Sequence, residues 1–160
     1  MVGLQTRHNP HTLTVICAPL GPIAELRVRS GVFFLRQYSP LHEQYPSQMF
    51  ERRIHPSLPL GQFLYFTDAA GQPAAFCNWA WLSGAVLKDV LSTGRDLLED
   101  EFQCGDQPFF YEMLAPFGHC REVVRRLRQI EPFKGRRIPA IRGAVCAASH
   151  PEPRVSYFCF

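Results

Sequence analysis

His42 is the side chain in this 160-residue sequence best suited to general acid–base chemistry. It lies in a short segment bounded by Ser39-Pro40 and Pro46, and these prolines restrict the backbone on both sides. An imidazole can exchange a proton with an amine or a hydroxyl around neutral pH. We therefore interpret His42 as a candidate general base in a loop, with an exposed or structural loop histidine as the alternative.

Glu112 is a carboxylate within an otherwise apolar segment. Residues 106–115 (DQPFFYEMLA) predict a strand, and their mostly apolar character favours a central position in a sheet. A buried carboxylate needs a partner, and one such partner is an imidazole that it orients. We expect Glu112 to assist His42 in catalysis. The alternative is a Glu112 that points to solvent from an edge strand.

The segment that follows this strand predicts an anion-binding site. Pro116-Phe117-Gly118 ends the strand, and residues 119–130 have the spacing of an amphipathic helix with arginines on its polar face. Unpaired backbone N–H groups at a helix start favour an anion. The candidate binding residues are Gly118, Arg121, Arg125 and Arg126. A solvated basic helix is the alternative, and the absence of a nucleic-acid-binding motif predicts no nucleic-acid partner.

The cysteines indicate reduced thiols in a cytoplasmic protein without a bound metal. No two of them form a C-x-x-C pair, and their spacings match no zinc template. They are Cys17, Cys77, Cys104, Cys120, Cys146 and Cys159. Cys120, beside His119, is a weaker candidate nucleophile because no third group in the sequence orients the pair. The sequence shows no signal-peptide pattern and no apolar run of about 20 residues that could span a bilayer.

The predicted elements that would position these side chains alternate between helix and strand. The predicted helices cover residues 23–38, 85–101 and 119–130. We expect a break in the first near Ser30-Gly31 and an interruption of the second at Gly94. The predicted strands cover residues 61–67, 72–83, 106–115, 137–142 and 155–160. The first two strands form a hairpin around a turn at 68–71.

Length and composition predict one α+β domain. A hydrophobic share of 46% against 19% charged residues excludes a disordered chain. Fourteen prolines, well above the usual share of about 5%, disfavour a long helical bundle. Residues 1–22 show no periodicity and are expected to form a poorly ordered arm, with the domain in residues 23–160. The expected fold class is a mixed, mostly antiparallel sheet flanked by helices.

Four strings of the sequence, in order and spacing, resemble the RTX toxin-activating lysine acyltransferases. They are Ser39-Pro40-Leu41-His42 followed by Tyr45-Pro46, then PAAFCNWA at 73–80, Cys104-Gly105-Asp106, and Ala115-Pro116-Phe117-Gly118. The resemblance runs from about residue 32 to 142. In that family the histidine of S-P-L-H is essential, and His42 matches it. The family has an aspartate four positions before the proline of A-P-F-G, whereas this chain has Glu112.

The resemblance implies a GNAT-like fold and an enzyme that moves a fatty acyl group from acyl carrier protein to internal lysines of an RTX-type protoxin. Its co-substrate would be the acyl thioester on the carrier's phosphopantetheine, with no tightly bound cofactor. His42 would be the base or a transient acyl acceptor, assisted by Glu112. Residues 118–142 contain eight basic and two acidic residues and therefore carry a charge of +6. The whole chain has a net charge of +3, so the remaining residues together carry −3. This surface would attract an acidic carrier protein.

Two other functions remain as alternatives. One is an accessory protein or chaperone that binds toxin or carrier with weakened catalysis, since Glu112 departs from the family aspartate. The other is a small-molecule N-acyltransferase that uses acyl-CoA. The expected oligomeric state is either a monomer or a homodimer.

Overall fold

A six-stranded sheet forms the centre of the computed structural model, which describes residues 13–142 and 153–160. The strands lie side by side in chain order: β1 (Thr14–Ile16), β2 (Phe63–Thr67), β3 (Pro73–Leu82), β4 (Gln107–Leu114), β5 (Arg137–Arg142) and β6 (Arg154–Cys159). Neighbouring strands are antiparallel except β4 and β5, which run parallel. The predicted α+β class, with a mixed and mostly antiparallel sheet, is confirmed.

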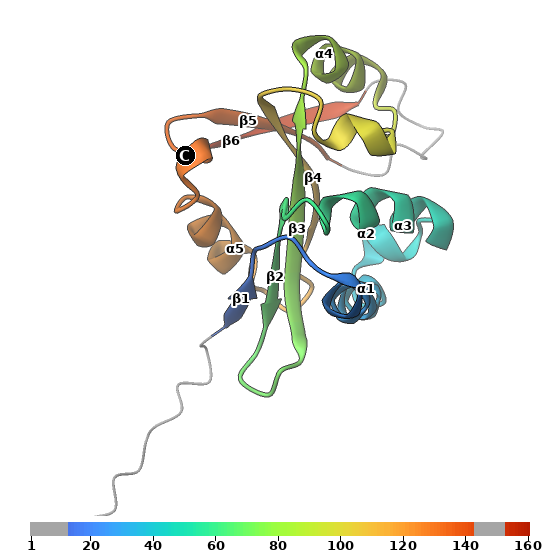
Figure 1. Cartoon of the computed structure of the whole chain (residues 1–160), viewed down its shortest axis with the longest axis vertical. Coiled ribbons are helices and arrows are strands. Elements are labelled where there is room, and N and C mark those ends of the chain that lie inside the picture. The colour runs from blue at the N-terminus through green and yellow to red at the C-terminus, as the bar shows by residue number, and fades with distance from the viewer. Residues whose placement is uncertain (1–12, 143–152) are drawn as a thin grey trace, which may run out of the picture.

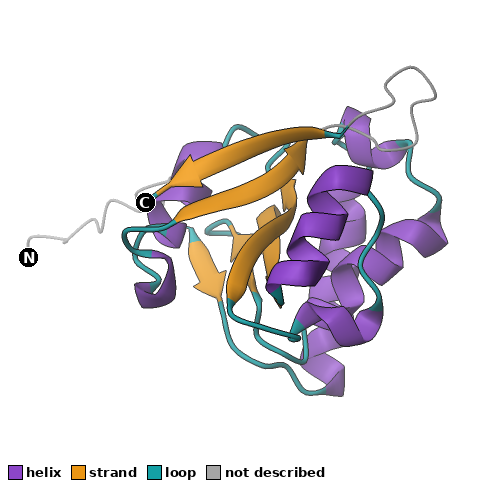
Figure 2. Cartoon of the chain, turned by 90° about the horizontal axis from the view of Figure 1, so that it is seen from above, coloured by secondary structure: helices purple, strands orange, loops and turns teal. Residues whose placement is uncertain are grey.

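Helices cover both faces of this sheet. They are α1 (Pro22–Arg36), α2 (Pro40–Glu43), α3 (Ser47–Ile54), α4 (Gly84–Thr93) and α5 (Cys120–Leu127), with 3₁₀ turns η1 (His55–Ser57), η2 (Glu99–Phe102) and η3 (Glu131–Phe133). In Figure 1, α1, α2 and α3 lie to the right of the sheet and α5 to the left, and Figure 2 shows the same layers from above.

The alternation of β2 explains these two layers. Successive strand residues point to opposite faces, so Phe63 packs with α1 and α3 while Leu64 packs with α5. Both faces are apolar, and β2 is accordingly a continuous hydrophobic run. The predicted hairpin is confirmed, and Asp68 stabilises its turn by accepting the N–H groups of Ala70 and Gln72 at 2.9 Å each.

Several boundaries differ from the sequence predictions. The expected break in α1 is wrong, because Gly31 continues the helix and gives space to the buried Tyr65 ring of β2. His42 lies in the one-turn helix α2 rather than in a loop. The helix expected over 85–101 ends at Thr93, because the next residue, Gly94, adopts a left-handed conformation with φ of 69°.

Neither α3 nor β1 was predicted from the sequence. The strand β1 falls within the arm expected to be poorly ordered, and it pairs with β2 through Val15 opposite Phe66. Residues 1–12 of that arm lie outside the described residues. No helix in the described part of the chain is long and apolar enough to cross a membrane.

Candidate active site

His42 is held in place by the short helix α2. Ser39-Pro40 begins this helix, with Pro40 at the first helical position where its missing N–H costs nothing. Arg36 of α1 stabilises the carboxyl end of α2, because its guanidinium donates to the carbonyl of His42 at 2.9 Å and to the carbonyl of Tyr45. The side chain of His42 is buried, with only 4% of the residue exposed.

The structure brings His42 and Glu112 together across 70 residues of sequence. Nε2 of His42 lies 2.8 Å from Oε2 of Glu112, and both residues are buried. On the other side of the ring, Nδ1 lies 2.6 Å from the hydroxyl of Ser39. The imidazole is thus partnered at both nitrogens, and its orientation is fixed by two independent elements, α2 and β4.

A buried arginine, Arg53 of α3, completes the charge balance of the site. It donates to Oε1 of Glu112, and its Nε donates to Asp96 at 2.9 Å. Burial by itself would lower the pKa of the Arg53 guanidinium, but the neighbouring charges, Glu112 foremost, act in the opposite direction and raise it above its ordinary value. Arg53 therefore stays cationic and compensates the carboxylate that faces His42.

The backbone of β4 is shaped to present Glu112. A bulge interrupts its pairing with β3, since Asn78 lies opposite Glu112 but Trp79 lies opposite Phe110. Adjacent residues of a regular strand point to opposite faces, but because of this bulge Tyr111 and Glu112 both contact Arg53. Asn78 strengthens this arrangement, because its side-chain oxygen accepts the N–H of Glu112 at 2.9 Å and its Nδ2 donates to the carbonyl of Arg53 at 2.8 Å.

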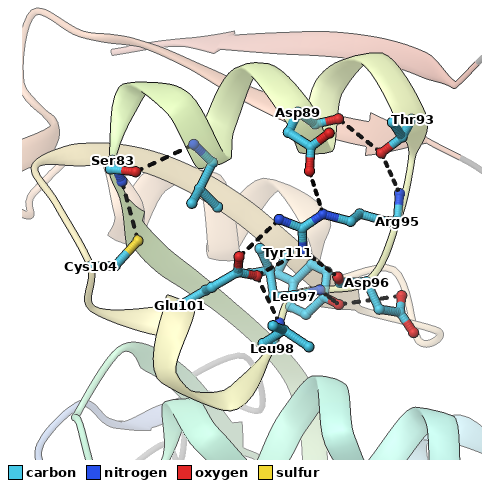
Figure 3. Close-up of polar contacts among 11 residues, drawn as sticks. Ser83, Asp89, Thr93, Arg95, Asp96, Leu97, Leu98, Glu101, Cys104 and Tyr111 are labelled. Atoms are coloured by element: carbon cyan, nitrogen blue, oxygen red, sulfur yellow. Dashed lines mark hydrogen bonds and ion pairs between the residues drawn. The ribbon is translucent and has the colours of Figure 1, made fainter.

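The loop that carries Asp96 is braced by Arg95, as Figure 3 shows. The guanidinium of Arg95 donates to Asp89 of α4 at 2.6 Å and makes two bonds of 2.8 Å to Glu101 of η2. The hydroxyl of Tyr111 accepts the N–H of Leu97 at 3.0 Å. Burial raises the pKa of Tyr111, so this hydroxyl remains a neutral hydrogen-bonding group.

A cavity of about 310 Å³ lies against the His42–Glu112 pair. Its walls are largely apolar and include Phe110, Met113, Ile141 and Phe158. Met113 packs on the α5 side of the sheet, whereas Glu112 faces α3, so the cavity reaches both faces. The cavity passes between β4 and β5. These strands pair at Phe110 and Ala140, and the residues that follow this pair on both strands line the cavity.

The other predicted binding residues do not line this cavity. Gly118 lies in the β4–α5 loop with φ of +88°, and Arg121, Arg125 and Arg126 are exposed on α5. Arg125 pairs with Glu122 of the same helix at 2.7 Å. The connection to the site is indirect: Phe117 of the loop contacts the ring of Tyr38, with ring centroids 5.2 Å apart, shortly before α2.

The cysteines within the described ranges are free thiols. Cys120, the weaker candidate nucleophile, is exposed at the start of α5 and is absent from the cavity lining. Cys77 does line the cavity, but burial raises the pKa of its thiol and so disfavours the thiolate.

Comparisons with known proteins identify the family. A family model described as the HlyC RTX toxin acyltransferase family matches residues 22–158. The lysine-acyltransferase RtxC of Vibrio cholerae is 42% identical over 142 residues, which are 88% of each chain. The protein-lysine myristoyltransferase HlyC of Escherichia coli is 28% identical over 107 residues, and this match spans 67% of the present chain and 62% of the relative.

Among solved structures, an acetyltransferase of the GNAT family from Listeria monocytogenes 4b F2365 is similar, with a TM-score of 0.47 and 12% identity. That alignment covers 81% of this chain and 77% of the other. The match of the family model over most of the sequence, together with the relative from Vibrio cholerae, shows that the chain is an acyltransferase and belongs to the RTX toxin acyltransferase family.

Proposed function

We propose that this enzyme transfers a fatty acyl group from acyl carrier protein to internal lysines of an RTX-type protoxin, with His42 as general base and Glu112 as its supporting carboxylate. The observation that carries the proposal is the buried His42–Glu112 pair, 2.8 Å apart, at the wall of a largely apolar cavity. The relatives from Vibrio cholerae and Escherichia coli, named as lysine acyltransferases, support the reaction class.

The chemistry requires a base because a lysine is protonated near neutral pH and must lose a proton before its nitrogen can attack a thioester. His42 can accept that proton, and the imidazolium so formed is stabilised by Glu112 at Nε2. Arg53 keeps the charge of Glu112 compensated before the proton arrives. A transient acyl-His42 is the competing mechanism.

The cavity suits a fatty acyl thioester. Aromatic and aliphatic side chains cover most of its wall, which favours an acyl chain over a polar group. Because it reaches both faces of the sheet, the donor and the lysine can approach the reacting carbon from different sides. Acyl carrier protein, which is acidic, would dock on the exposed arginines of α5 around Gly118.

The test is co-expression with a neighbouring RTX protoxin and measurement of the intact mass of the toxin. His42→Ala should lower the rate of acylation at least 10²-fold, the usual contribution of a general base. Glu112→Gln should slow it strongly, whereas Glu112→Asp should retain part of the rate because the carboxylate is kept. His55→Ala, which removes a half-exposed histidine outside the site, is the control.

Folding of each variant is checked by its thermal unfolding midpoint. Full acylation of the toxin by a folded His42→Ala protein would refute the assignment of the base. A toxin that gains no mass even with the wild-type enzyme and an acyl carrier protein would refute the proposed reaction. Turnover with acyl-CoA and a free amine alone would favour a small-molecule acyltransferase instead.

A further inference from the structure

The cavity beside His42 has a polar half and an apolar half, one on each face of the sheet. His42, Glu112 and Arg53 line it on the side of α3. On the side of α5, four neighbouring strands contribute uncharged side chains that belong to or pack on the hydrophobic cluster under α5. They are Cys77 of β3, Phe110 and Met113 of β4, Ala140 of β5 and Phe158 of β6. This half is suited to a hydrocarbon chain.

The apolar half is closed at β3. Cys77 is 1% exposed and lies opposite Leu64 of β2, which is equally buried and does not line the cavity. On β5, by contrast, the exposed Arg142 lines the cavity. Arg142 follows Ala140 by two positions on the same strand, so it lies on the same face of the sheet. The α5-side half therefore extends from an open end with a cation to a closed apolar end at Cys77.

An acyl thioester on phosphopantetheine has the same distribution of polarity. Its hydrocarbon chain ends in a methyl group, and on the other side of the thioester its arm carries a phosphate, which an arginine can bind. The donor thus fits this half with the methyl end toward Cys77 and the phosphate toward Arg142. The thioester then lies at the gap between β4 and β5, beside His42.

The small size of Cys77 leaves space at the closed end. Burial raises the pKa of its thiol, and a neutral buried cysteine behaves as a small hydrophobic side chain. Protein cores normally fill such space, because unfilled apolar volume lowers stability. A longer side chain at this position would extend into the cavity and shorten it.

We propose that the acyl chain of the donor lies in the α5-side half of the cavity with its methyl end against Cys77, and that the size of this side chain sets the longest acyl chain that the enzyme transfers. The inference rests on the proposed acyl transfer and deepens it by naming a residue that determines acyl specificity. The polar half on the α3 side remains for the acceptor lysine, whose nitrogen reaches the thioester carbon through the gap between β4 and β5.

The test measures kcat/KM with acyl carrier proteins that carry saturated chains of graded length, from octanoyl to stearoyl. A single methylene in a hydrophobic pocket changes kcat/KM by about 10–200-fold. With Cys77→Met, the longest chain that the wild type accepts should therefore lose at least about tenfold in kcat/KM, whereas shorter chains keep their rate. Cys77→Ala deepens the closed end and should raise kcat/KM for the next longer chain several-fold.

The matched control is Ala75→Val. Ala75 lies two residues before Cys77 on the same face of β3, is buried, and does not line the cavity. The added methyl groups should lower the unfolding midpoint by overpacking but leave the preference for chain length unchanged. Cys77→Met should have little effect on the unfolding midpoint, because its added atoms enter the cavity.

An unchanged preference for chain length in Cys77→Met would overturn the inference, and so would an equal shift in Ala75→Val. If Cys77→Met does not fold, Cys77→Ala decides, because an unchanged upper limit of chain length in that variant also contradicts the inference. A preference that shifts in Phe158→Ala but in neither Cys77 variant would place the methyl end at β6 instead.

Binding of S-acyl N-acetylcysteamine thioesters separates this inference from the proposed function. These neutral probes carry the acyl chain without the carrier protein. The unfolding midpoint of the wild type should rise with chain length up to a limit, and Cys77→Met should lower that limit. If the wild type acylates no lysine while the limit shifts as expected, the proposed function fails and the acyl site stands. If the wild type acylates the toxin but the limit does not move, the acyl site is refuted and the proposed function stands.

Discussion

Arg53 is the residue on which the charges of the site depend. Its guanidinium lies between two carboxylates, Glu112 and Asp96, and stacks on the ring of Tyr111 at 4.6 Å. The head group is planar and can bond both carboxylates at once, which a lysine ammonium on a flexible stem cannot do with the same geometry. Loss of this cation would leave the buried Glu112 uncompensated.

We expect Arg53→Met to lower the free energy of unfolding by about 3–5 kcal/mol, the usual cost of an unpaired buried charge. Acylation should fall with it, because Glu112 would no longer be held toward His42. Urea denaturation measures the first effect. The neighbouring Arg52→Met, on an exposed side chain, should change stability by less than about 0.5 kcal/mol. Equal losses in the two variants would contradict the role given to Arg53.

At this scale the sequence predicted His42 and Glu112 but not the other members of the polar network. Glu112 stood out as a carboxylate in an apolar strand, and the same reasoning applies to Asn78 within FCNWA, which sequence reasoning did not single out. Arg53 shares the buried face of α3 with Phe50 and Ile54, so a helical spacing of three and four could have marked it. Asp96 carries no comparable signal, because only the fold places its loop beside Arg53. Ser39 was visible as part of a motif but not as a partner of Nδ1.

Among the elements, α1 shows how tertiary packing overrides local preference. Gly31 suggested a helix break, yet the helix continues and uses the absence of a side chain to lie close to Tyr65. A Cβ at this position would collide with the ring of a tyrosine that is only 4% exposed. Since α1 ends just before α2, a shift of α1 would also displace the segment that carries His42.

Gly31→Ala therefore gives two opposed expectations. Helix propensity alone would stabilise the protein by roughly 1 kcal/mol, whereas overpacking against Tyr65 should destabilise it by about 1–3 kcal/mol. We expect the packing effect to dominate, and urea denaturation will show its sign. Gly84→Ala, at the start of α4 with open space around it, is the matched control and should not lose stability. A more stable Gly31→Ala protein would show that the α1–β2 contact relaxes easily.

The elements that the sequence predicted well are those with strong local patterns. The strands β2, β3 and β4 are long apolar runs bounded by turn residues, and α5 has a clear amphipathic spacing. The missed elements have weaker local patterns. The strand β1 has three residues and acquires its structure from pairing with β2. The helix α3 is as long as α5, but a charged residue, Arg53, interrupts the apolar face formed by Phe50 and Ile54.

For the whole molecule, the uneven charge is the main prediction about partners. The exposed arginines of α5 lie outside the cavity, so their replacement should affect carrier docking more than chemistry. We expect Arg125→Glu combined with Arg126→Glu to raise the KM for acyl carrier protein several-fold with little change in kcat, and more strongly at low salt. Steady-state kinetics at two ionic strengths measures this.

The matched control for net charge is Arg27→Glu combined with Lys88→Glu. Both side chains are exposed on other helices, α1 and α4, and the total change in charge is the same. If the control raises the KM as much as the α5 variant does, general electrostatic attraction explains docking. An unchanged KM in the α5 variant would remove these arginines from the docking surface.

The parallel contact between β4 and β5 divides the sheet unevenly. In the described structure these strands pair at Phe110 and Ala140, whereas β5 and β6 pair along six positions. The β5–β6 hairpin is thus a unit bonded strongly within itself and joined to the rest mainly by side chains, such as Phe158 against Phe110 at 5.2 Å. In hydrogen-exchange terms, a seam with so few ladder hydrogen bonds should open at a lower free-energy cost than the continuous β3–β4 ladder beside it. Such an opening would widen the cavity between β4 and β5 without unfolding the elements that hold His42 and Glu112.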